Sequence, residues 1–197
     1  MSDNESIPNS TCVVLAGSVD AGKSSLIGVI MDGKLDDGCG LARAKVAKHP
    51  HEIETGKTSD ISVRNIKIDN KQLIMVDLCG HERYLKTTLY GITGHFPDYG
   101  ILVVAANRGL LPMTKEHLGI YLYMNIPFII VITRVDLVFD NERIYDNTVK
   151  QIKRICSQFS KKAVFVNSAE EFKLQEQELL IAENLAKDSA KNLSNMI

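Results

Sequence analysis

Residues 17–24 have the sequence Gly17-Ser18-Val19-Asp20-Ala21-Gly22-Lys23-Ser24, which matches the pattern GxxxxGK[ST]. An apolar run at residues 11–16 precedes this stretch and predicts a buried strand, while residues 23–31 have the apolar spacing of a helix. The two glycines let successive backbone N–H groups point inward without a Cβ in the way, and the N-terminus of the helix adds partial positive charge. A strand, a loop of this kind and a helix in this order predict a site for phosphate groups.

The residue types in this loop indicate what each one does. We expect Lys23 to place its charge on the β- and γ-phosphates of a nucleoside triphosphate and the Ser24 hydroxyl to ligate Mg²⁺. The residues expected to contact the nucleotide are Gly17, Ser18, Val19, Asp20, Ala21, Gly22, Lys23, Ser24 and Ser25.

The rest of the chain alternates predicted strands with predicted helices. The strands are expected at residues 61–68, 72–76, 99–106, 128–133 and 163–166, with a turn at residues 69–70. The runs at 99–106 and 128–133 are apolar almost throughout, which is typical of strands covered on both faces. The helices are expected at residues 114–124, with Thr114 as the N-cap, 141–159 and 170–193. This order predicts an α/β fold, a P-loop NTPase domain whose mostly parallel sheet has helices on both faces and one antiparallel edge strand.

Length and composition predict one soluble domain. We expect a flexible N-terminus at residues 1–10 and a single domain at residues 11–197, since 197 residues are too few for two comfortable domains. Residues 32–60 are polar and punctuated by glycine, which predicts a mobile segment with one helical turn near residues 41–47. The net charge of −1 argues against a sequence-independent grip on a nucleic-acid backbone. No apolar run is long enough to span a bilayer, so we expect a cytoplasmic protein that does not contact membranes.

A second motif, Asp77-Leu78-Cys79-Gly80, follows the predicted strand at residues 72–76. An Asp at the end of a sheet strand can hold Mg²⁺ through a water molecule, and the Gly80 N–H can contact the γ-phosphate. Residues 77–95 would then change position with that phosphate. Because the pattern DxxG is common, a simple turn is the alternative.

A third motif, Thr133-Arg134-Val135-Asp136, follows the predicted strand at residues 128–133. The Asp136 carboxylate can accept two hydrogen bonds from the N1 and N2 groups of guanine, which adenine cannot offer. The alternative is a turn from strand to helix with Asp136 near the start of the helix.

In their order and spacing these three motifs resemble the G domain of elongation-factor-type translational GTPases. Residues 77–88, 91–95 and 114–119 are similar to one branch of that family, the GTP-binding-protein-1-like group. The resemblance covers about residues 12–166 and implies a GTPase that binds GTP or GDP with Mg²⁺. The β-barrel domains that follow the G domain in that family have no counterpart in these residues, so tRNA delivery is not implied.

The resemblance also implies individual roles. Thr58 would ligate Mg²⁺ in the first switch segment, residues 32–60, and would act in catalysis together with Lys23 and His81. His81 would orient the attacking water; its alternative role is to cap a helix. Asp20 would hold a monovalent cation. Ser168-Ala169 would support guanine, unless residues 163–166 form an additional strand that precedes the true motif.

Three residues depart from the family pattern. Ser18 stands where elongation factors usually have His, Lys57 where many have an apolar residue that restrains the catalytic His, and Arg134 where Lys is usual. The hypothesis that follows is a GTP-hydrolysing switch that acts as a monomer with an unidentified protein effector or activator, with ribosome or RNA suggested by kinship alone. An interaction module that binds the nucleotide and scarcely hydrolyses it is one alternative, and an ATP-using P-loop protein is another.

Overall fold

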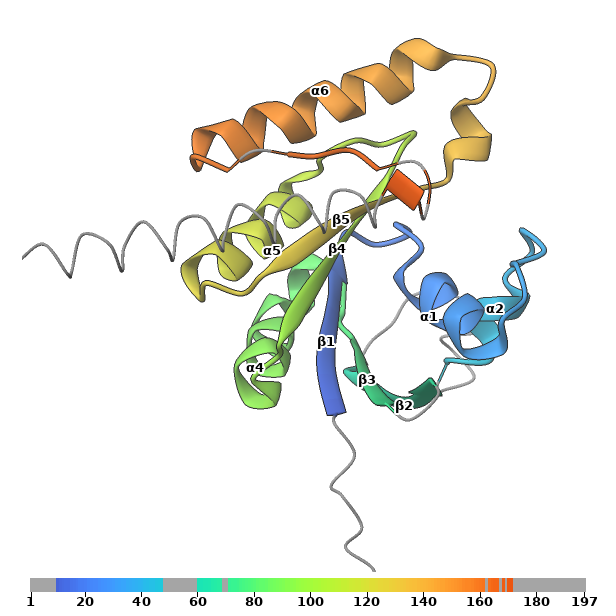
Figure 1. The fold of residues 1–197 in the computed structure, drawn as a ribbon, viewed down its shortest axis with the longest axis vertical. Helices are drawn as coiled ribbons and strands as arrows, with labels where there is room; N and C mark the ends of the chain where they lie inside the picture. The colour runs from blue at the N-terminus through green and yellow to red at the C-terminus, as the bar shows by residue number, and fades with distance from the viewer. Residues whose placement is uncertain are drawn as a thin grey trace, which may run out of the picture. The chain divides into compact units, whose positions relative to one another are not determined.

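The structure, a computed structural model, describes residues 10–47, 60–68, 71–161, 163–166, 168 and 170–171. The contacts within the chain divide it into two compact units, Met1–Ile152 and Lys153–Ile197. The first unit contains all five strands of the sheet (Figure 1).

The strands form one sheet in the order β2-β3-β1-β4-β5. Strand β1 pairs in parallel with β3 and β4, β4 pairs in parallel with β5, and β2 runs antiparallel to β3 at the edge. The predicted fold class, a mostly parallel sheet with one antiparallel edge strand, is therefore confirmed. The strands are β1 (Ser10–Gly17), β2 (Ser62–Ile68), β3 (Lys71–Asp77), β4 (Tyr99–Ala105) and β5 (Phe128–Thr133).

The register of the parallel strands decides where the three motifs lie. Leu15 of β1 is opposite Asp77, the last residue of β3, and Gly17 is opposite Val103 of β4. Ala105 of β4 is opposite Thr133, the last residue of β5. Because parallel strands end at the same edge of a sheet, each of the three motifs leaves the sheet at that edge.

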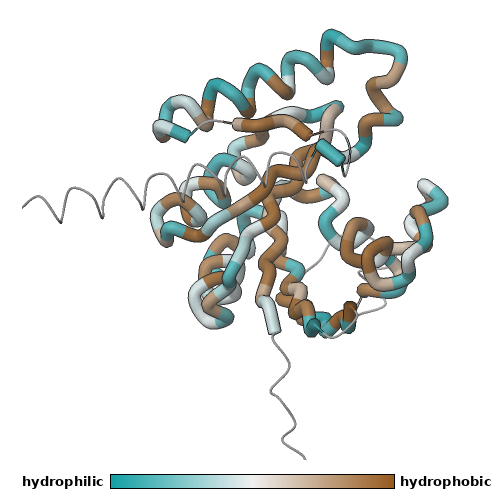
Figure 2. Tube along the Cα trace, viewed as in Figure 1, coloured by the Kyte–Doolittle hydropathy of each residue, from teal (hydrophilic) through white to brown (hydrophobic). Residues whose placement is uncertain are grey.

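The central strands form the core of the first unit. Val14 and Leu15 of β1 and Leu102 and Val103 of β4 have no exposed surface, although successive side chains point to opposite faces. Burial on both faces is typical of parallel strands between two layers of helices. Figure 2 shows the same strands as the hydrophobic centre of the sheet.

Helices cover both faces, as predicted. Figure 1 shows α1 and α2 on one side of the sheet and α4 and α5 on the other. Helix α1 packs on β1 and β3, and α5 packs on β1 and β4. Helix α2 confirms the helical turn expected near residues 41–47. The helices are α1 (Lys23–Asp32), α2 (Leu41–Ala44), η1 (Glu82–Tyr84), α4 (Leu85–His95), α5 (Pro112–Tyr123), η2 (Val135–Val138) and α6 (Glu142–Gln158).

Three local predictions are wrong. Helix α5 begins two residues before Thr114, because Pro112 has the fixed φ that suits the first turn of a helix and lacks an N–H that would need a partner there. Residues 163–166 are not a strand, and Val164 is 48% exposed. Strand β5 is not covered on both faces along its whole length, since Ile129 is 52% exposed.

Some predictions concern residues that the structure does not describe. They are the turn at residues 69–70, most of the N-terminus at residues 1–10, the second half of the segment at residues 32–60, and the helix at residues 170–193 beyond residue 171.

Candidate functional site

The loop between β1 and α1 turns through several residues with positive φ. Gly17 has φ 142°, Asp20 has φ 59° and Gly22 has φ 89°. A Cβ on Gly17 would lie 2.3 Å from the backbone oxygen of Val103, so the loop can leave β1 this close to β4 only with glycine at its start. Gly22 is the N-cap of α1, so the loop ends where this helix begins.

Lys23 is buried at the start of α1 and points back into the loop. Its side chain is 6% exposed, and Nζ donates to the backbone oxygens of Gly17 at 3.1 Å and Ser18 at 3.0 Å. Burial lowers the pKa of Lys23, while the negative charge of Asp77 opposes that shift. An anionic ligand in the loop would favour the charged form of this lysine, as Asp77 does.

Helix α5 supports the loop through two side chains. The backbone N–H of Gly17 donates to Nδ1 of His117 at 3.0 Å, and the hydroxyls of Ser18 and Thr114 are 2.6 Å apart. Thr114 and His117 are almost completely buried, at 1% and 0% exposure. Burial, with a smaller effect of Lys23, lowers the pKa of His117 to about 4, so the imidazole is neutral at pH 7.

Neither supporting side chain was predicted from the sequence to contact the loop. Thr114 and His117 are three positions apart, so the sequence does indicate that they share one face of α5. The sequence could not say that this face meets the phosphate loop. Ser18 stands where the family usually has His, and its hydroxyl is hydrogen-bonded to Thr114.

The second motif brings a carboxylate to the first. The hydroxyl of Ser24 donates to Oδ2 of Asp77 at 2.5 Å, and Asp77 is 1% exposed. Two oxygen donors held this close, one of them a carboxylate, are the kind of ligands that Mg²⁺ prefers in proteins. Thr58, the third predicted metal ligand, lies outside the described residues.

The backbone after Asp77 lies directly against the phosphate loop. A Cβ on Gly80 would be 2.5 Å from Nζ of Lys23, 2.7 Å from the carbonyl carbon of Ser18 and 2.7 Å from the nitrogen of Val19. Only glycine can bring its backbone this close. Burial, with the charge of Asp77, raises the pKa of the preceding Cys79 to about 11, so its thiol is protonated at neutral pH.

His81 follows Gly80 and is exposed. Its Nδ1 accepts a hydrogen bond from the backbone N–H of Arg83 at 3.1 Å, and the residue is the N-cap of η1. The capping role considered for His81 is therefore present. With Nδ1 as an acceptor, the neutral ring has its proton on Nε2.

The third motif is joined to the phosphate loop through Thr133. Its hydroxyl donates to the backbone oxygen of Ala21 at 2.6 Å. Arg134 has φ 55°, and Asp136 lies in the short helix η2, so the strand-to-helix turn considered as an alternative is present. Both Arg134 and Asp136 are exposed, which leaves the carboxylate open to a ligand.

The remaining predicted residues are less connected. The Asp20 carboxylate lies 3.9 Å from the Arg108 guanidinium, and both side chains are partly exposed. Ser168 accepts a hydrogen bond from the backbone N–H of Glu171 at 3.1 Å and belongs to the second unit. Ala169 is outside the described residues. Among the residues that the structure describes, no helix has both the length and the apolarity needed to cross a membrane.

Comparison with known proteins shows the family of this chain. The family model for the elongation factor Tu GTP binding domain matches residues 8–193. GTP-binding protein 1 of Xenopus laevis is 40% identical over 168 residues, which are 73% of this chain and 25% of that protein. GTP-binding protein 2 of Mus musculus is 37% identical over 167 residues, which are 74% of this chain and 27% of that protein.

The fold is similar to solved structures as well. The crystal structure of bacterial selenocysteine-specific elongation factor EF-Sec superimposes with a TM-score of 0.64 at 26% identity, over 91% of this chain and 29% of that one. The chain thus spans about a quarter of the length of the curated relatives it matches.

Proposed function

The chain belongs to the family of elongation factor Tu GTP-binding domains, and we propose that it is a switch that binds Mg²⁺·GTP and hydrolyses it to GDP and phosphate. One observation supports this above the others. Gly80 lies against the phosphate loop beside Lys23, while Asp77 contacts Ser24. The segment that would sense the γ-phosphate is thus already beside the loop that would hold it.

The residues present fit a bound nucleotide. The loop from Gly17 to Ser25 supplies backbone N–H groups at the N-terminus of α1, and Lys23 supplies a full positive charge. Asp136 would accept hydrogen bonds from guanine, with Thr133 holding its strand end to the loop and Arg134 packing beside the base. The family resemblance further implies that Ser168-Ala169 would support guanine.

The oxygen atoms of Ser24 and Asp77 fit Mg²⁺, with Thr58 as a further ligand in this proposal. When bound, the ion would neutralise charge on the phosphates. Asp20 does not fit a monovalent cation as it stands, because the Arg108 guanidinium already supplies a positive charge 3.9 Å away. No step is therefore assigned to such an ion.

Hydrolysis would depend on position and charge. Lys23 would stabilise negative charge on the phosphates, and His81, next to Gly80, would orient the attacking water with its Nε2 edge. Residues 32–60 and 77–95 would be the two switch segments. Without an arginine supplied by a partner, we expect slow turnover, roughly 10⁻⁴ to 10⁻² per second.

A second candidate is an interaction module that binds the nucleotide but scarcely hydrolyses it. It is favoured by the exposed position of His81 and by the use of its Nδ1 in capping η1. Under either proposal the domain would be a cytoplasmic monomer that acts through a protein effector or activator. A ribosomal or RNA partner follows from family analogy alone.

Calorimetry with Mg²⁺ tests the binding proposal. We expect GTP and GDP to release heat on binding and ATP to compete poorly with them. We expect Asp136→Asn to lower the affinity for both guanine nucleotides. An absence of heat from both GTP and GDP would overturn the proposed function. ATP that competes as well as GTP would instead favour the ATP-using alternative.

Single-turnover hydrolysis separates the two candidates. We expect His81→Ala to slow hydrolysis by on the order of tenfold or more while GTP affinity stays the same. His95→Ala is the matched control, since Nδ1 of His95 lies 2.8 Å from the backbone oxygen of Gly91, a contact within α4 itself. Equal rates for wild type and His81→Ala would favour the interaction module.

A further inference from the structure

Helix α4 holds a carbonyl of the Asp77–Gly80 segment. The hydroxyl of Thr88 donates to the backbone oxygen of Cys79 at 2.9 Å. Thr88 and Cys79 both have 0% exposure, so water cannot replace this hydrogen bond. Loss of this partner would leave a buried carbonyl without a hydrogen bond and would destabilise this arrangement by the desolvation free energy of the carbonyl.

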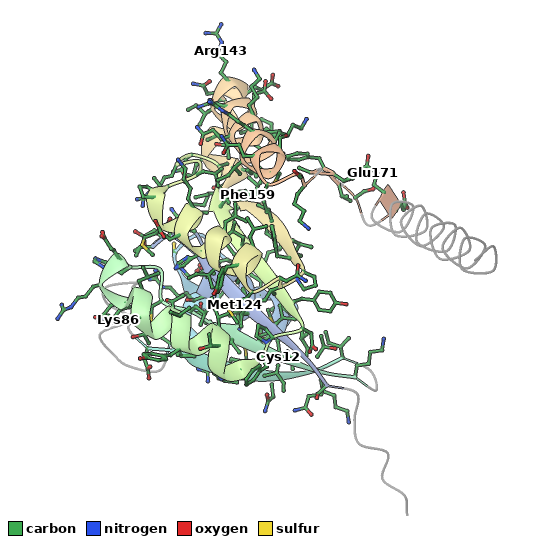
Figure 3. All side chains as sticks on the ribbon, turned by 90° about the vertical axis from the view of Figure 1, so that its left-hand side faces the viewer. Cys12, Lys86, Met124, Arg143, Phe159 and Glu171 are labelled. Atoms are coloured by element: carbon green, nitrogen blue, oxygen red, sulfur yellow. The ribbon has the colours of Figure 1, made fainter. Side chains whose placement is uncertain are left out.

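The helix that presents Thr88 is closely packed on the same segment. A Cβ on Gly91, one turn further along α4, would lie 2.6 Å from Cδ2 of Leu78. Lys86, labelled in Figure 3, is exposed near the start of the same helix. Thr88 is two positions after Lys86, a step of about 200° around a helix, so Thr88 lies on the opposite, inner face.

On its other side the segment is bonded to the sheet. The backbone N–H of Leu78 donates to the oxygen of Leu15 at 3.2 Å. Residues 78 and 79 are thus held between β1 and α4. The backbone of Gly80, which comes next, lies directly against the phosphate loop.

The carbonyl that Thr88 holds belongs to the peptide that ends in the Gly80 amide. No cis peptide bond occurs in the described residues, and in a trans peptide the C=O and N–H groups point in opposite directions. While the oxygen points to Thr88, the Gly80 N–H must point away from α4. The Thr88 hydroxyl therefore helps to fix the orientation of this amide.

We propose that Thr88 is a positioning residue for recognition of the γ-phosphate, because its hydroxyl aims the Gly80 N–H at that group. This inference rests on the proposed function. GDP has no γ-phosphate, so its affinity does not depend on the Gly80 amide. Loss of the Thr88 hydroxyl should consequently weaken the binding of GTP and leave the affinity for GDP almost unchanged.

Nucleotide affinity tests this inference with a graded series at one position. We would measure dissociation constants for GDP and a non-hydrolysable GTP analogue in wild type, Thr88→Ser, Thr88→Cys and Thr88→Val. We expect Thr88→Val to weaken binding of the analogue about tenfold and binding of GDP less than twofold. The tenfold change corresponds to the loss of one buried hydrogen bond. Thr88→Ser should restore wild-type values, and Thr88→Cys, a weak donor of similar volume, should fall between.

Thr93→Val is the matched control on the same helix. The Thr93 hydroxyl donates to the Leu89 oxygen at 2.9 Å, a bond within α4 itself. Its loss should not change the ratio of the two affinities. If Thr88→Val weakened both nucleotides equally, or neither, Thr88 would have a structural role only and the inference would be wrong. Thr88→Cys decides the matter if Thr88→Val does not fold.

Hydrogen exchange gives a second measurement that needs no nucleotide. Without ligand, we expect Thr88→Val to raise amide exchange in residues 78–84 and Thr88→Ser and Thr93→Val to leave it unchanged. Unchanged exchange in Thr88→Val would contradict the inference. Wild-type protein that bound neither nucleotide would overturn the proposed function instead, while this readout would still decide whether Thr88 holds the segment.

Discussion

The Nδ1 atom of His117 accepts a hydrogen bond from the Gly17 backbone N–H at 3.0 Å, although the two residues are 100 positions apart. Gly17 begins the phosphate loop and His117 belongs to α5. With the contact between Ser18 and Thr114, this bond attaches the loop to a helix other than the one that follows it. The shape of the loop therefore depends on how α5 packs against the sheet.

The first prediction is a dependence of stability on pH. Burial lowers the pKa of His117 to about 4, whereas the ordinary value is 6.5. Between these values the unfolded chain binds a proton that the folded protein does not, so the free energy of unfolding falls as the pH drops from 6.5 towards 4. The loss should reach about 3 kcal/mol, the product of the shift and about 1.36 kcal/mol per unit. Urea denaturation between pH 7.5 and pH 4.5 measures it.

His117→Asn is the control, because an Asn side chain can accept a hydrogen bond but does not titrate. Its stability should be lower at pH 7.5 and should vary less between pH 6.5 and pH 4.5. The explanation would be wrong if wild type and variant lost stability in parallel across that range.

The second prediction concerns the packing of α1 on α2. A Cβ on Gly28 would lie 2.1 Å from the backbone oxygen of Ala42, so Gly28→Ala must displace α2. We expect a loss of about 1–3 kcal/mol from overpacking, measured by denaturant unfolding. Gly119→Ala is the matched control, since nothing lies within 4 Å of its Cβ position in α5. It should stabilise by about 0.5–1 kcal/mol, and equal effects at the two positions would exclude the steric explanation.

The third prediction concerns the metal site. Asp77→Asn keeps an oxygen near Ser24 but removes the charge that attracts Mg²⁺. In the presence of Mg²⁺, we expect the variant to bind GDP only as tightly as wild type does when a chelator has removed the Mg²⁺. Calorimetry measures both affinities. Asp98→Asn is the control, because the Asp98 carboxylate accepts from the Cys12 backbone N–H at 2.7 Å, near the start of β1. A full Mg²⁺ dependence in Asp77→Asn would show that the ion does not use this carboxylate.

The fourth prediction concerns the contact between Thr133 and the Ala21 oxygen, at 2.6 Å. Thr133→Val leaves the Ala21 oxygen without this donor. The affinities for GTP and GDP should both fall by the same factor, on the order of fivefold, which is about 1 kcal/mol. Thr133→Ser should restore both affinities. A change in GTP affinity alone would indicate that Thr133 acts on the γ-phosphate rather than on the loop.

Local patterns made much of this molecule predictable. The glycines and Lys23 of the loop, Asp77 and Gly80 at the end of β3, and Thr133 at the end of β5 are signals within short stretches, and the structure brings them to one edge of the sheet. Parallel strands end at the same edge, so a correct order of strands and helices was enough to predict this neighbourhood. The error at residues 163–166 has the opposite origin, since apolar residues become a strand only where another strand can pair with them.

The α/β fold, the phosphate loop and the three motifs follow from the amino-acid sequence alone, because each depends on residues that are neighbours in the chain. The side chains that hold the phosphate loop and the Asp77–Gly80 segment depend instead on tertiary packing: His117 bonds Gly17, Thr133 bonds Ala21, and Thr88 bonds Cys79. Each of these hydrogen bonds joins two different elements, and its strength depends on burial. Burial is a property of the packed elements together, which no short stretch of sequence contains.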